Sequence, residues 1–312
     1  MHIVLVGPGA LGCLLASRLS RSAPLHRLTL LDHNQSRARM LQAHGLRYFN
    51  QENEEAIHLA VSSSPRAIGV ADVVMLCVKS YDVVDSLRFC APLQGPDTLL
   101  VFMQNGVAHL DIVVDSSLGT PAYGTTTEGA TLVGPGQVRH AGKGLSQFGF
   151  LHQPSLETTR RLRQVTELFT ASGLAARTSD NILSRLWTKL VVNVGINGLT
   201  ALLGCPNGEL LVRAETAQRM ETLVAEALAV ARAANISVPA DSLAITREVC
   251  TKTAANISSM LQDVRAKRRT EIEAINGAIV ARGKKYGIAT PENSRLVAEI
   301  QSIEQRYLQH NA

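Results

Sequence analysis

The sequence predicts an α/β fold, in which a doubly wound parallel sheet at the N-terminus is followed by an all-helical C-terminal domain. Short apolar runs, typical of buried strands, alternate with helical segments up to about residue 178. A glycine-rich turn follows the first of these runs. Beyond residue 180, long helical patterns replace the strand signals. We therefore expect two domains, residues 1–178 and residues 179–312.

The first apolar run, residues 3–6, leads directly into a turn with the spacing G-x-G-x-x-G. The turn consists of Gly7, Pro8, Gly9, Ala10, Leu11 and Gly12. In such a turn Gly7 allows a sharp bend, Gly9 lets a pyrophosphate approach the backbone, and Gly12 lets the helix pack closely on the strand. The N-terminus of the helix then faces the negative charge of the phosphates. This order of elements predicts a Rossmann-type dinucleotide site.

The second strand, residues 27–31, ends at Asp32, 20 residues beyond Gly12. An acid at this position binds the ribose diol of NAD(H). Three basic residues follow closely, and they would instead neutralise the 2′-phosphate of NADP(H): His33, Arg37 and Arg39. Asp32 is also suited to cap the helix that starts near Asn34. The residues alone leave the choice between the two cofactors open.

Two further buried strands are expected at residues 73–78 and 98–102, with helices near 81–89 and 107–116. Lys79 ends the first strand, and Asn105 follows the second. Because the carboxyl ends of parallel strands face the ligand crevice, we expect both side chains to contact the cofactor. A surface lysine and a simple turn are the alternatives.

The remaining elements complete the two predicted domains. Residues 122–150, rich in Gly and Thr, predict antiparallel strands that close the sheet, and a helix follows over 156–172. The C-terminal half predicts helices over 181–203, 212–234, 241–255, 258–285 and 292–309.

The helix predicted over 181–203 carries a polar stripe in an otherwise apolar sequence. Its members are Lys189, Asn193, Asn197 and Thr200. On a helix they fall within roughly 80° of one another, along about 16 Å. A buried ammonium is costly without an anion or water beside it, so the stripe predicts a small anionic, oxygenated ligand. A wet groove or a neighbouring helix would satisfy it as well.

A second set of polar residues lies in and before the helix predicted over 258–285. Ser258 or Ser259 either caps this helix or binds a ligand, and Glu271 lies further along it. On one straight helix Ser259 and Glu271 would be about 120° and about 18 Å apart. They meet one small ligand only if the helix bends or begins later.

Composition excludes several classes of protein. With 46% apolar and 18% charged residues, the 312-residue chain is long enough for two ordinary domains. A net charge of +5, with basic residues scattered except over 265–269, does not indicate nucleic-acid binding. The N-terminus has no basic segment typical of a signal peptide, and no apolar run of about 18 residues indicates a membrane span.

Five widely spaced cysteines form no C-x-x-C pair, so neither a disulfide framework nor a metal site is expected. This pattern fits a reducing cytoplasm. The sequence does not give the oligomeric state and leaves a homodimer open.

Several short motifs occur in order along nearly the whole chain. They are Gly7 to Gly12, Cys77-Val78-Lys79, Gln104-Asn105-Gly106, Gly124-Thr125-Thr126-Thr127, Leu186-Trp187-Thr188-Lys189-Leu190, Asn193 through Asn197, Cys205-Pro206-Asn207-Gly208-Glu209, Ala255 to Asp263, Arg269-Thr270-Glu271-Ile272 and Pro291-Glu292-Asn293. Together they resemble the ketopantoate reductase (2-dehydropantoate 2-reductase) family. The resemblance implies NADPH-dependent reduction of ketopantoate to (R)-pantoate, a step of pantothenate and coenzyme A biosynthesis.

The resemblance also implies roles for individual residues. Lys189 and Glu271 would be the catalytic residues, and Asn105 would lie near the nicotinamide ribose. The implied contacts to the 2-oxo acid substrate come from Asn105, Lys189, Asn193, Asn197, Asn256, Ser259 and Glu271. Lys79 matches the family's lysine for the 2′-phosphate, but Asp32 stands where many members carry an arginine. The expected cofactor is therefore NADP(H), with NAD(H) left open by Asp32.

Two other functions are compatible with these motifs. One is a related reductase acting on a different branched 2-oxo acid. Family membership determines the reaction more firmly than it determines which substrate side chain the enzyme accepts. The other is a catalytically silent regulator that binds NADPH. Lys189 and Glu271 argue against the regulator, because a sensor needs only the first half of the chain.

Overall fold

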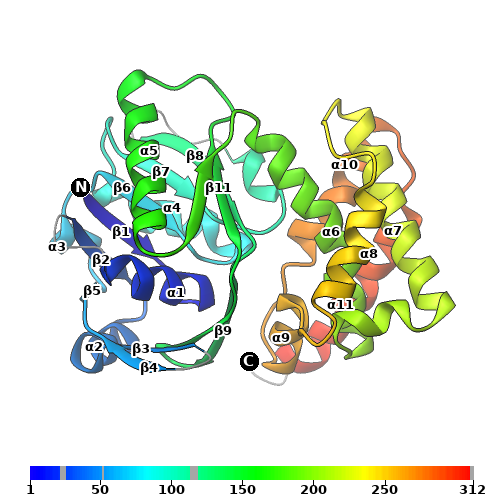
Figure 1. The fold of residues 1–312 in the computed structure, drawn as a ribbon, viewed down its shortest axis with the longest axis horizontal. Helices are drawn as coiled ribbons and strands as arrows, with labels where there is room; N and C mark the ends of the chain where they lie inside the picture. The colour runs from blue at the N-terminus through cyan, green and yellow to red at the C-terminus, as the bar shows by residue number, and fades with distance from the viewer. Residues whose placement is uncertain (22–25, 51–52, 113–118, 310–312) are drawn as a thin grey trace. The chain divides into compact units, whose positions relative to one another are not determined.

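The computed structural model describes residues 1–21, 26–50, 53–112 and 119–309, which form two compact units (Figure 1). The first unit comprises Met1–Gln104 and Ile112–Ile182, and the second comprises Asn105–Asp111 and Leu183–Ala312. All described strands belong to the first unit, and the second is helical. The predicted α/β class with a helical C-terminal part is therefore confirmed.

The first unit is built on an eight-stranded, mostly parallel sheet. In spatial order its strands are β12 (Ala175–Thr178), β11 (Leu145–Gly149), β8 (Thr120–Thr126), β7 (Leu99–Phe102), β6 (Val73–Leu76), β1 (His2–Val6), β2 (Arg27–Leu31) and β5 (Ala60–Ser62). The strands from β8 to β5 are parallel, β11 is antiparallel to β8, and β12 is parallel to β11. Chain order reverses between β1 and β6, which is where doubly wound sheets bind nucleotides.

A second, four-stranded sheet lies in the same unit and was not predicted. Its order is β4 (Glu54–Ile57), β3 (Leu46–Phe49), β10 (Gln137–Gly142) and β9 (Gly129–Gly134). The expectation that 122–150 would close the main sheet is thus only half right. β8 and β11 extend that sheet, whereas β10 pairs with β3.

The helices of the first unit follow the apolar periodicity. They are α1 (Ala10–Leu19), α2 (Gln35–His44), α3 (Pro65–Ile68), α4 (Val83–Phe89) and α5 (Leu156–Ala171). Leu14 and Leu15 of α1 are fully buried against the sheet core, which includes Ile3 and Leu5 of β1. The helix expected over 107–116 is instead a short 3-10 helix, η4 (Ala108–Asp111), and residues 113–116 lie outside the described residues.

The second unit contains six α-helices within its described residues. They are α6 (Ile182–Leu203), α7 (Ala214–Ala233), α8 (Ser242–Lys252), α9 (Ser259–Arg265), α10 (Ala278–Tyr286) and α11 (Pro291–Leu308). The 3-10 helix η6 (Asn207–Leu211) precedes α7, and the π-helical turn η7 (Glu273–Gly277) precedes α10.

Helix α6 is the central helix of this unit. A Cβ added to Gly195 would lie 2.9 Å from Val224 of α7 and 3.1 Å from Thr246 of α8. A Cβ on Gly198 would lie 2.7 Å from Leu296 of α11. By length and composition alone α6 is apolar enough to cross a membrane, but 67% of its apolar 18-residue stretch is buried inside the structure. Its close packing among three other helices accounts for that composition.

The prediction of one continuous helix over 258–285 is wrong, because α9 ends at Arg265. The chain closes there with hydrogen bonds from Lys267 N to Val264 O at 3.0 Å and from Arg268 N to Asp263 O at 2.9 Å. This is the pattern of a Schellman cap, with Lys267 at φ 52° in the left-handed position that glycine usually occupies. Without a glycine, the sequence carried no stop signal.

Candidate functional site

The glycine turn has the backbone geometry of a phosphate-binding loop. Gly7 adopts φ +96° and donates its N–H to Leu31 O at 3.0 Å. A Cβ on Gly12 would lie 2.0 Å from Gly7 O, so only glycine fits there. Gly9 caps α1, and a Cβ built on it would have no non-neighbouring atom closer than 3.9 Å. The turn therefore leaves room for a pyrophosphate at the helix N-terminus.

The other residues of the turn complete this cradle. Ala10 and Leu11 form the first turn of α1. Pro8 is buried, and its carbonyl oxygen accepts a hydrogen bond from Cys13 Sγ at 3.3 Å. The predicted cofactor contacts of these residues stay predictions, but the shape of the cradle fits a dinucleotide.

Asp32 lies at the end of β2 with its side chain fully buried. Its carboxylate accepts hydrogen bonds from Arg37 Nε at 2.5 Å and Nη2 at 2.8 Å, and from Asn34 N at 2.9 Å. The hydrogen bond to Asp32 also raises the pKa of Arg37. Asn34, not Asp32, caps α2, because its side chain accepts the N–H of Arg37. The acid at this position is thus already neutralised within the chain.

The end of β6 adjoins the glycine turn, since a Cβ on Gly7 would lie 2.6 Å from Val78 Cγ1. Lys79 follows immediately, before the 3-10 helix η2 (Ser80–Asp82). Gln104 Nε2 secures this loop by donating to Leu76 O at 2.8 Å and to Val78 O at 3.1 Å. The strand expected to run to residue 78 ends at Leu76, so Lys79 lies three residues beyond it, and the sequence gave Gln104 no such role.

In the second unit, Asn105 joins Lys189 to Glu271. Its Oδ1 accepts a hydrogen bond from Lys189 Nζ at 2.9 Å, and its Nδ2 donates to Glu271 Oε2 at 3.2 Å. These two bonds together set the orientation of the Asn105 amide. The structure thus brings together three residues that the family resemblance implied as substrate contacts, although Asn105 was expected near the nicotinamide ribose as well.

Burial governs the electrostatics of this triad. Lys189 is half-buried on α6, and Glu271 is 5% exposed. Desolvation lowers the pKa of Lys189 to about 8, although the nearby Glu271 carboxylate opposes the change. An amine with this pKa is mostly protonated at neutral pH and still gives up its proton readily, as a general acid must.

The segment that carries Asn105 is bound tightly at Gly106. Gly106 adopts φ +78°, and a Cβ on it would lie 2.0 Å from Ala274 O. The next residue, Val107, donates its N–H to the same carbonyl at 3.3 Å. His109 follows in η4 with 1% of its surface exposed, and burial lowers its pKa to about 4 against the opposing effect of Glu271. No pattern in the sequence singled out His109.

Glu271 is held by the backbone on either side of it. Thr270 donates its N–H to Glu304 Oε1 at 2.6 Å, and Ile272 donates to Thr270 Oγ1 at 3.2 Å. The π-helical turn η7 begins two residues after Glu271. Such turns inside helices often mark functional positions.

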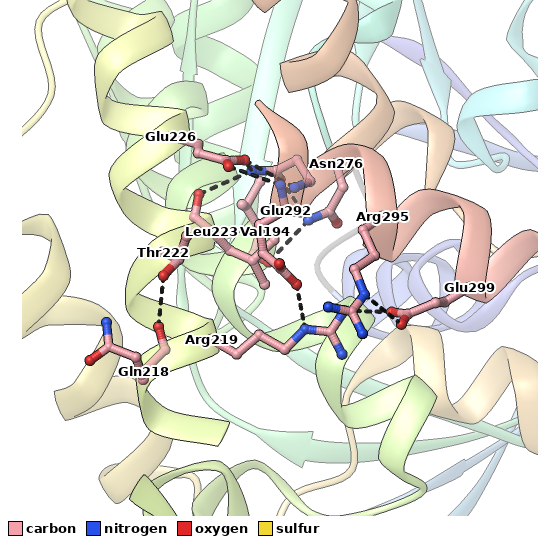
Figure 2. A network of polar contacts seen from close by, with 11 residues as sticks. Val194, Gln218, Arg219, Thr222, Leu223, Glu226, Asn276, Glu292, Arg295 and Glu299 are labelled. Atoms are coloured by element: carbon pink, nitrogen blue, oxygen red, sulfur yellow. Dashed lines mark hydrogen bonds and ion pairs between the residues drawn. The ribbon is translucent and has the colours of Figure 1, made fainter. Parts of the chain in front are cut away.

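A network of buried polar contacts links this turn to α6, α7 and α11, as Figure 2 shows. Asn276 of η7 donates from Nδ2 to Val194 O at 3.2 Å and to Asn293 Oδ1 at 2.9 Å. Asn293 Nδ2 in turn donates to Glu226 Oε2 at 2.7 Å. The network therefore fixes the helix that carries Lys189 relative to the turn that follows Glu271.

The other members of the polar stripe on α6 differ in whether their side chains have a partner within the protein. Thr200 Oγ1 donates to Ser258 Oγ at 2.7 Å, so this end of the stripe is tied to the start of α9. Asn193 is half-buried and Asn197 is 7% exposed. Neither side-chain amide forms a hydrogen bond with any residue that the structure describes, which leaves both available to a ligand.

At the start of α9, Ser258 rather than Ser259 is the helix cap, since its Oγ accepts the N–H of Leu261 at 3.1 Å. Ser259 and Asn256 are exposed. Because α9 ends before Glu271, the conflict expected on a single straight helix does not arise. The ligand contacts expected of Ser259 and Asn256 stay predictions.

Both parts of the chain match the sequence profiles of one protein family. Residues 3–153 match the profile described as ketopantoate reductase PanE/ApbA, and residues 181–304 match its C-terminal counterpart. A 2-dehydropantoate 2-reductase of Vibrio cholerae is 34% identical, and one of Halobacterium salinarum is 32% identical. Each alignment covers 98% of this chain and 99% of the relative.

Solved structures with the same fold include two related enzymes. The crystal structure of a PanE/ApbA family ketopantoate reductase from Ralstonia eutropha JMP134 has a TM-score of 0.89 at 30% identity, covering 99% of this chain and 100% of that one. A ternary structure of D-mandelate dehydrogenase with NADH and anilino(oxo)acetate has a TM-score of 0.89 at 28% identity, covering 98% and 99%. On the matches to both halves of its sequence, the chain belongs to the ketopantoate reductase family.

Proposed function

We propose that this protein is an oxidoreductase, a 2-dehydropantoate 2-reductase that converts ketopantoate to (R)-pantoate for pantothenate and coenzyme A biosynthesis. The observation that carries the proposal is the hydrogen-bonded set of Lys189, Asn105 and Glu271. A cation able to release a proton, next to a carboxylate and unused amides, suits a small hydroxylated 2-oxo acid. The full-length relatives of the family support the same activity.

The nucleotide would be held by the first unit. The open space above Gly9, at the N-terminus of α1, fits a dinucleotide, whose pyrophosphate would bind the backbone from Gly7 to Gly12. When bound, reduced nicotinamide supplies the hydride for the C2 ketone. Lys79 would bind the adenosine phosphate, and Asn105 would lie near the nicotinamide ribose.

Lys189 has two tasks in this reaction. Its ammonium polarises the substrate carbonyl, and its Nζ donates the proton that the developing alkoxide needs. Glu271 accepts a hydrogen bond from the substrate hydroxyl and orients the molecule. Asn105 holds Nζ and the carboxylate at fixed positions, so neither has to reorganise when substrate binds.

The remaining substrate contacts come from amide and hydroxyl groups. Asn193 and Asn197 lie on the same face of α6 as Lys189, and their amides bond no described residue. They would bind the substrate's carboxylate and hydroxyl oxygens. Ser259 and Asn256 would add contacts from the start of α9. We further propose that residues 1–178 act as the nucleotide-binding domain and residues 179–312 as the substrate-binding domain.

For the cofactor we propose NADP(H) over NAD(H). A ribose-binding acid must offer its oxygens to the diol, but both oxygens of Asp32 accept hydrogen bonds from Arg37. Arg37 itself is 37% exposed, so its guanidinium is accessible to a 2′-phosphate. NADH remains the necessary comparison, because the related D-mandelate dehydrogenase was solved with it.

We also propose that the protein acts in the cytoplasm. All five cysteines are free thiols, as expected in a reducing compartment. We propose a homodimer as the oligomeric state, which a measurement of the protein's mass in solution tests.

Steady-state kinetics with NADPH and NADH test the proposal. The substrates are ketopantoate, a second branched 2-oxo acid and phenylglyoxylate, the oxo acid that corresponds to mandelate. We expect kcat/KM to be highest for ketopantoate with NADPH, by about tenfold or more. A higher value for another oxo acid would support the related-reductase function instead. Binding of NADPH without oxidation of any substrate would indicate a regulator.

A further inference from the structure

Arg282 of α10 contacts the segment that carries Asn105 at two points. Its Nη2 donates to Val107 O at 3.1 Å and to Asp111 Oδ2 at 2.9 Å, so it joins the two ends of the short η4 turn. The Arg282 side chain is 14% exposed, whereas that of Asp111 is 73% exposed. We call these three residues the Arg282 clamp.

The clamp also reaches the helix that carries Lys189. The guanidinium carbon of Arg282 lies 5.9 Å from the ring centroid of Trp187, which is fully buried on α6 two positions before Lys189. His109, within the clamped turn, interacts electrostatically with both Arg282 and Glu271. One side chain thus connects segment 105–111 with α6 and α10.

We propose that Arg282 is a positioning residue: by clamping segment 105–111 to the helical unit, it holds Asn105 between Lys189 and Glu271. The segment needs such a contact because its chain enters from the first unit at Gln104 and returns to it at Ile112. Without the clamp, the segment keeps the two side-chain bonds of Asn105 itself, its contacts at Gly106 and Val107 with Ala274, and the packing of its buried side chains, but it loses the contact at its far end.

The two contacts of Arg282 contribute unequally. The ion pair with Asp111 is exposed and therefore weak. The bond to Val107 O is part-buried and contributes more. Val107 O also accepts from Leu110 N at 3.2 Å, so loss of Arg282 loosens the segment without leaving this carbonyl unbonded. Variants at Arg282 should therefore fold.

Hydrogen–deuterium exchange of the peptide covering 105–111 tests the clamp without any turnover. For Arg282→Ala we expect exchange about tenfold faster or more at the Val107 and Leu110 amides. Asp111→Asn should change it by less than about threefold, because the exposed ion pair is weak. Arg282→Lys keeps the charge and one donor nitrogen on a shorter side chain, so its exchange rate should be intermediate. Arg295→Ala, on an exposed ion pair of α11, is the matched control and should leave the peptide unchanged.

Kinetics distinguish positioning from a merely structural role, and this part rests on the proposed function. Arg282→Ala should lower kcat by about tenfold while the KM for NADPH stays unchanged. The double variant Arg282→Ala/Asn105→Ala should be no slower than Asn105→Ala alone, since both changes remove the same contact.

Unchanged exchange in Arg282→Ala and Arg282→Lys would overturn the clamp, and so would losses of kcat that add in the double variant. If the wild-type protein reduces no 2-oxo acid, the proposed function fails, whereas the exchange measurement still decides whether Arg282 holds the segment.

Discussion

Lys189 Nζ donates a hydrogen bond to Oδ1 of Asn105 across 84 positions of sequence. One partner of the ammonium is thus a neutral amide, whose nitrogen donates to the carboxylate of Glu271. Burial lowers the pKa of Lys189, and the nearby Glu271 carboxylate opposes this change without reversing it. The relationship between Lys189 and Asn105 is the basis of the first two predictions.

Replacing Lys189 by methionine should lower kcat by about 10² or more, because the variant has no proton to donate and no charge to stabilise an alkoxide. The affinity for NADPH, measured by fluorescence titration, should stay unchanged. Lys252→Met, at an exposed lysine that pairs with Glu248, is the control and should be fully active. Near-normal turnover by the Lys189 variant would remove this residue from the reaction.

The activity should fall on the alkaline side with an apparent pKa of about 8. Burial favours the neutral amine and lowers the pKa of Lys189 to about 8, so the amine is protonated below this pH and loses its proton above it. A plot of log kcat/KM against pH should therefore turn down to a slope of about −1 above pH 8. In Lys189→Arg the remaining activity should lack this limb, since a guanidinium stays charged. A limb unchanged in that variant would assign the titration to another group.

Local patterns predicted the parts of this protein that depend on local geometry. The turn from Gly7 to Gly12 was found because its spacing follows from the steric needs of one strand, one bend and one helix. The bond between Asn105 and Lys189 was not found, because pairing across 84 residues depends on the path of the chain between them. The sequence placed Asn105 after a strand, and it follows β7 by three residues, but the sequence could not show that Asn105 belongs to the helical unit.

Other features were missed for related reasons. The end of α9 has a lysine, Lys267, where glycine would have signalled a stop. The strands β3 and β4 are only four residues long, too short for a clear alternation. His109 became a feature of the site only through burial beside Glu271, which no spacing along the chain reports.

Arg37→Ala should raise the KM for NADPH by about tenfold or more and that for NADH by less than about threefold. The arginine is the exposed member of its pair with the buried Asp32, so it is the group able to meet a 2′-phosphate. Because Asp32 loses its partner, the melting temperature should fall as well, and it must be measured. Arg88→Ala, at an exposed arginine paired with Asp85, controls for net charge. An equal loss with both cofactors would contradict the proposed NADP(H) preference.

Gly12→Ala should abolish NADPH binding and destabilise the first unit by about 1–3 kcal/mol. The new methyl group would lie 2.0 Å from Gly7 O, and either α1 or the turn must move to relieve the clash. Gly142→Ala is the matched control, because no atom lies within 4 Å of its Cβ position. Isothermal titration with NADPH and thermal unfolding measure the two effects. Normal binding by Gly12→Ala would show that the turn does not hold the cofactor.

Glu226→Ala should destabilise the helical unit by about 2–4 kcal/mol. Its carboxylate accepts the N–H groups of Glu292 and Asn293, each at 2.9 Å, and so caps α11 from another helix (Figure 2). The variant leaves these donors without a carboxylate partner and frees the Asn293 side chain, which is bonded to Asn276.

The midpoint of urea unfolding measures this loss, with Glu221→Gln as the control. Glu221 also lies on α7, but it makes an ion pair with the exposed Arg247, so we expect a change below about 1 kcal/mol. Because Asn276 also bonds Val194 O on α6, kcat of the Glu226 variant should fall before the unit unfolds. A destabilised variant with unchanged kcat would show that the network holds α11 in place without positioning Lys189.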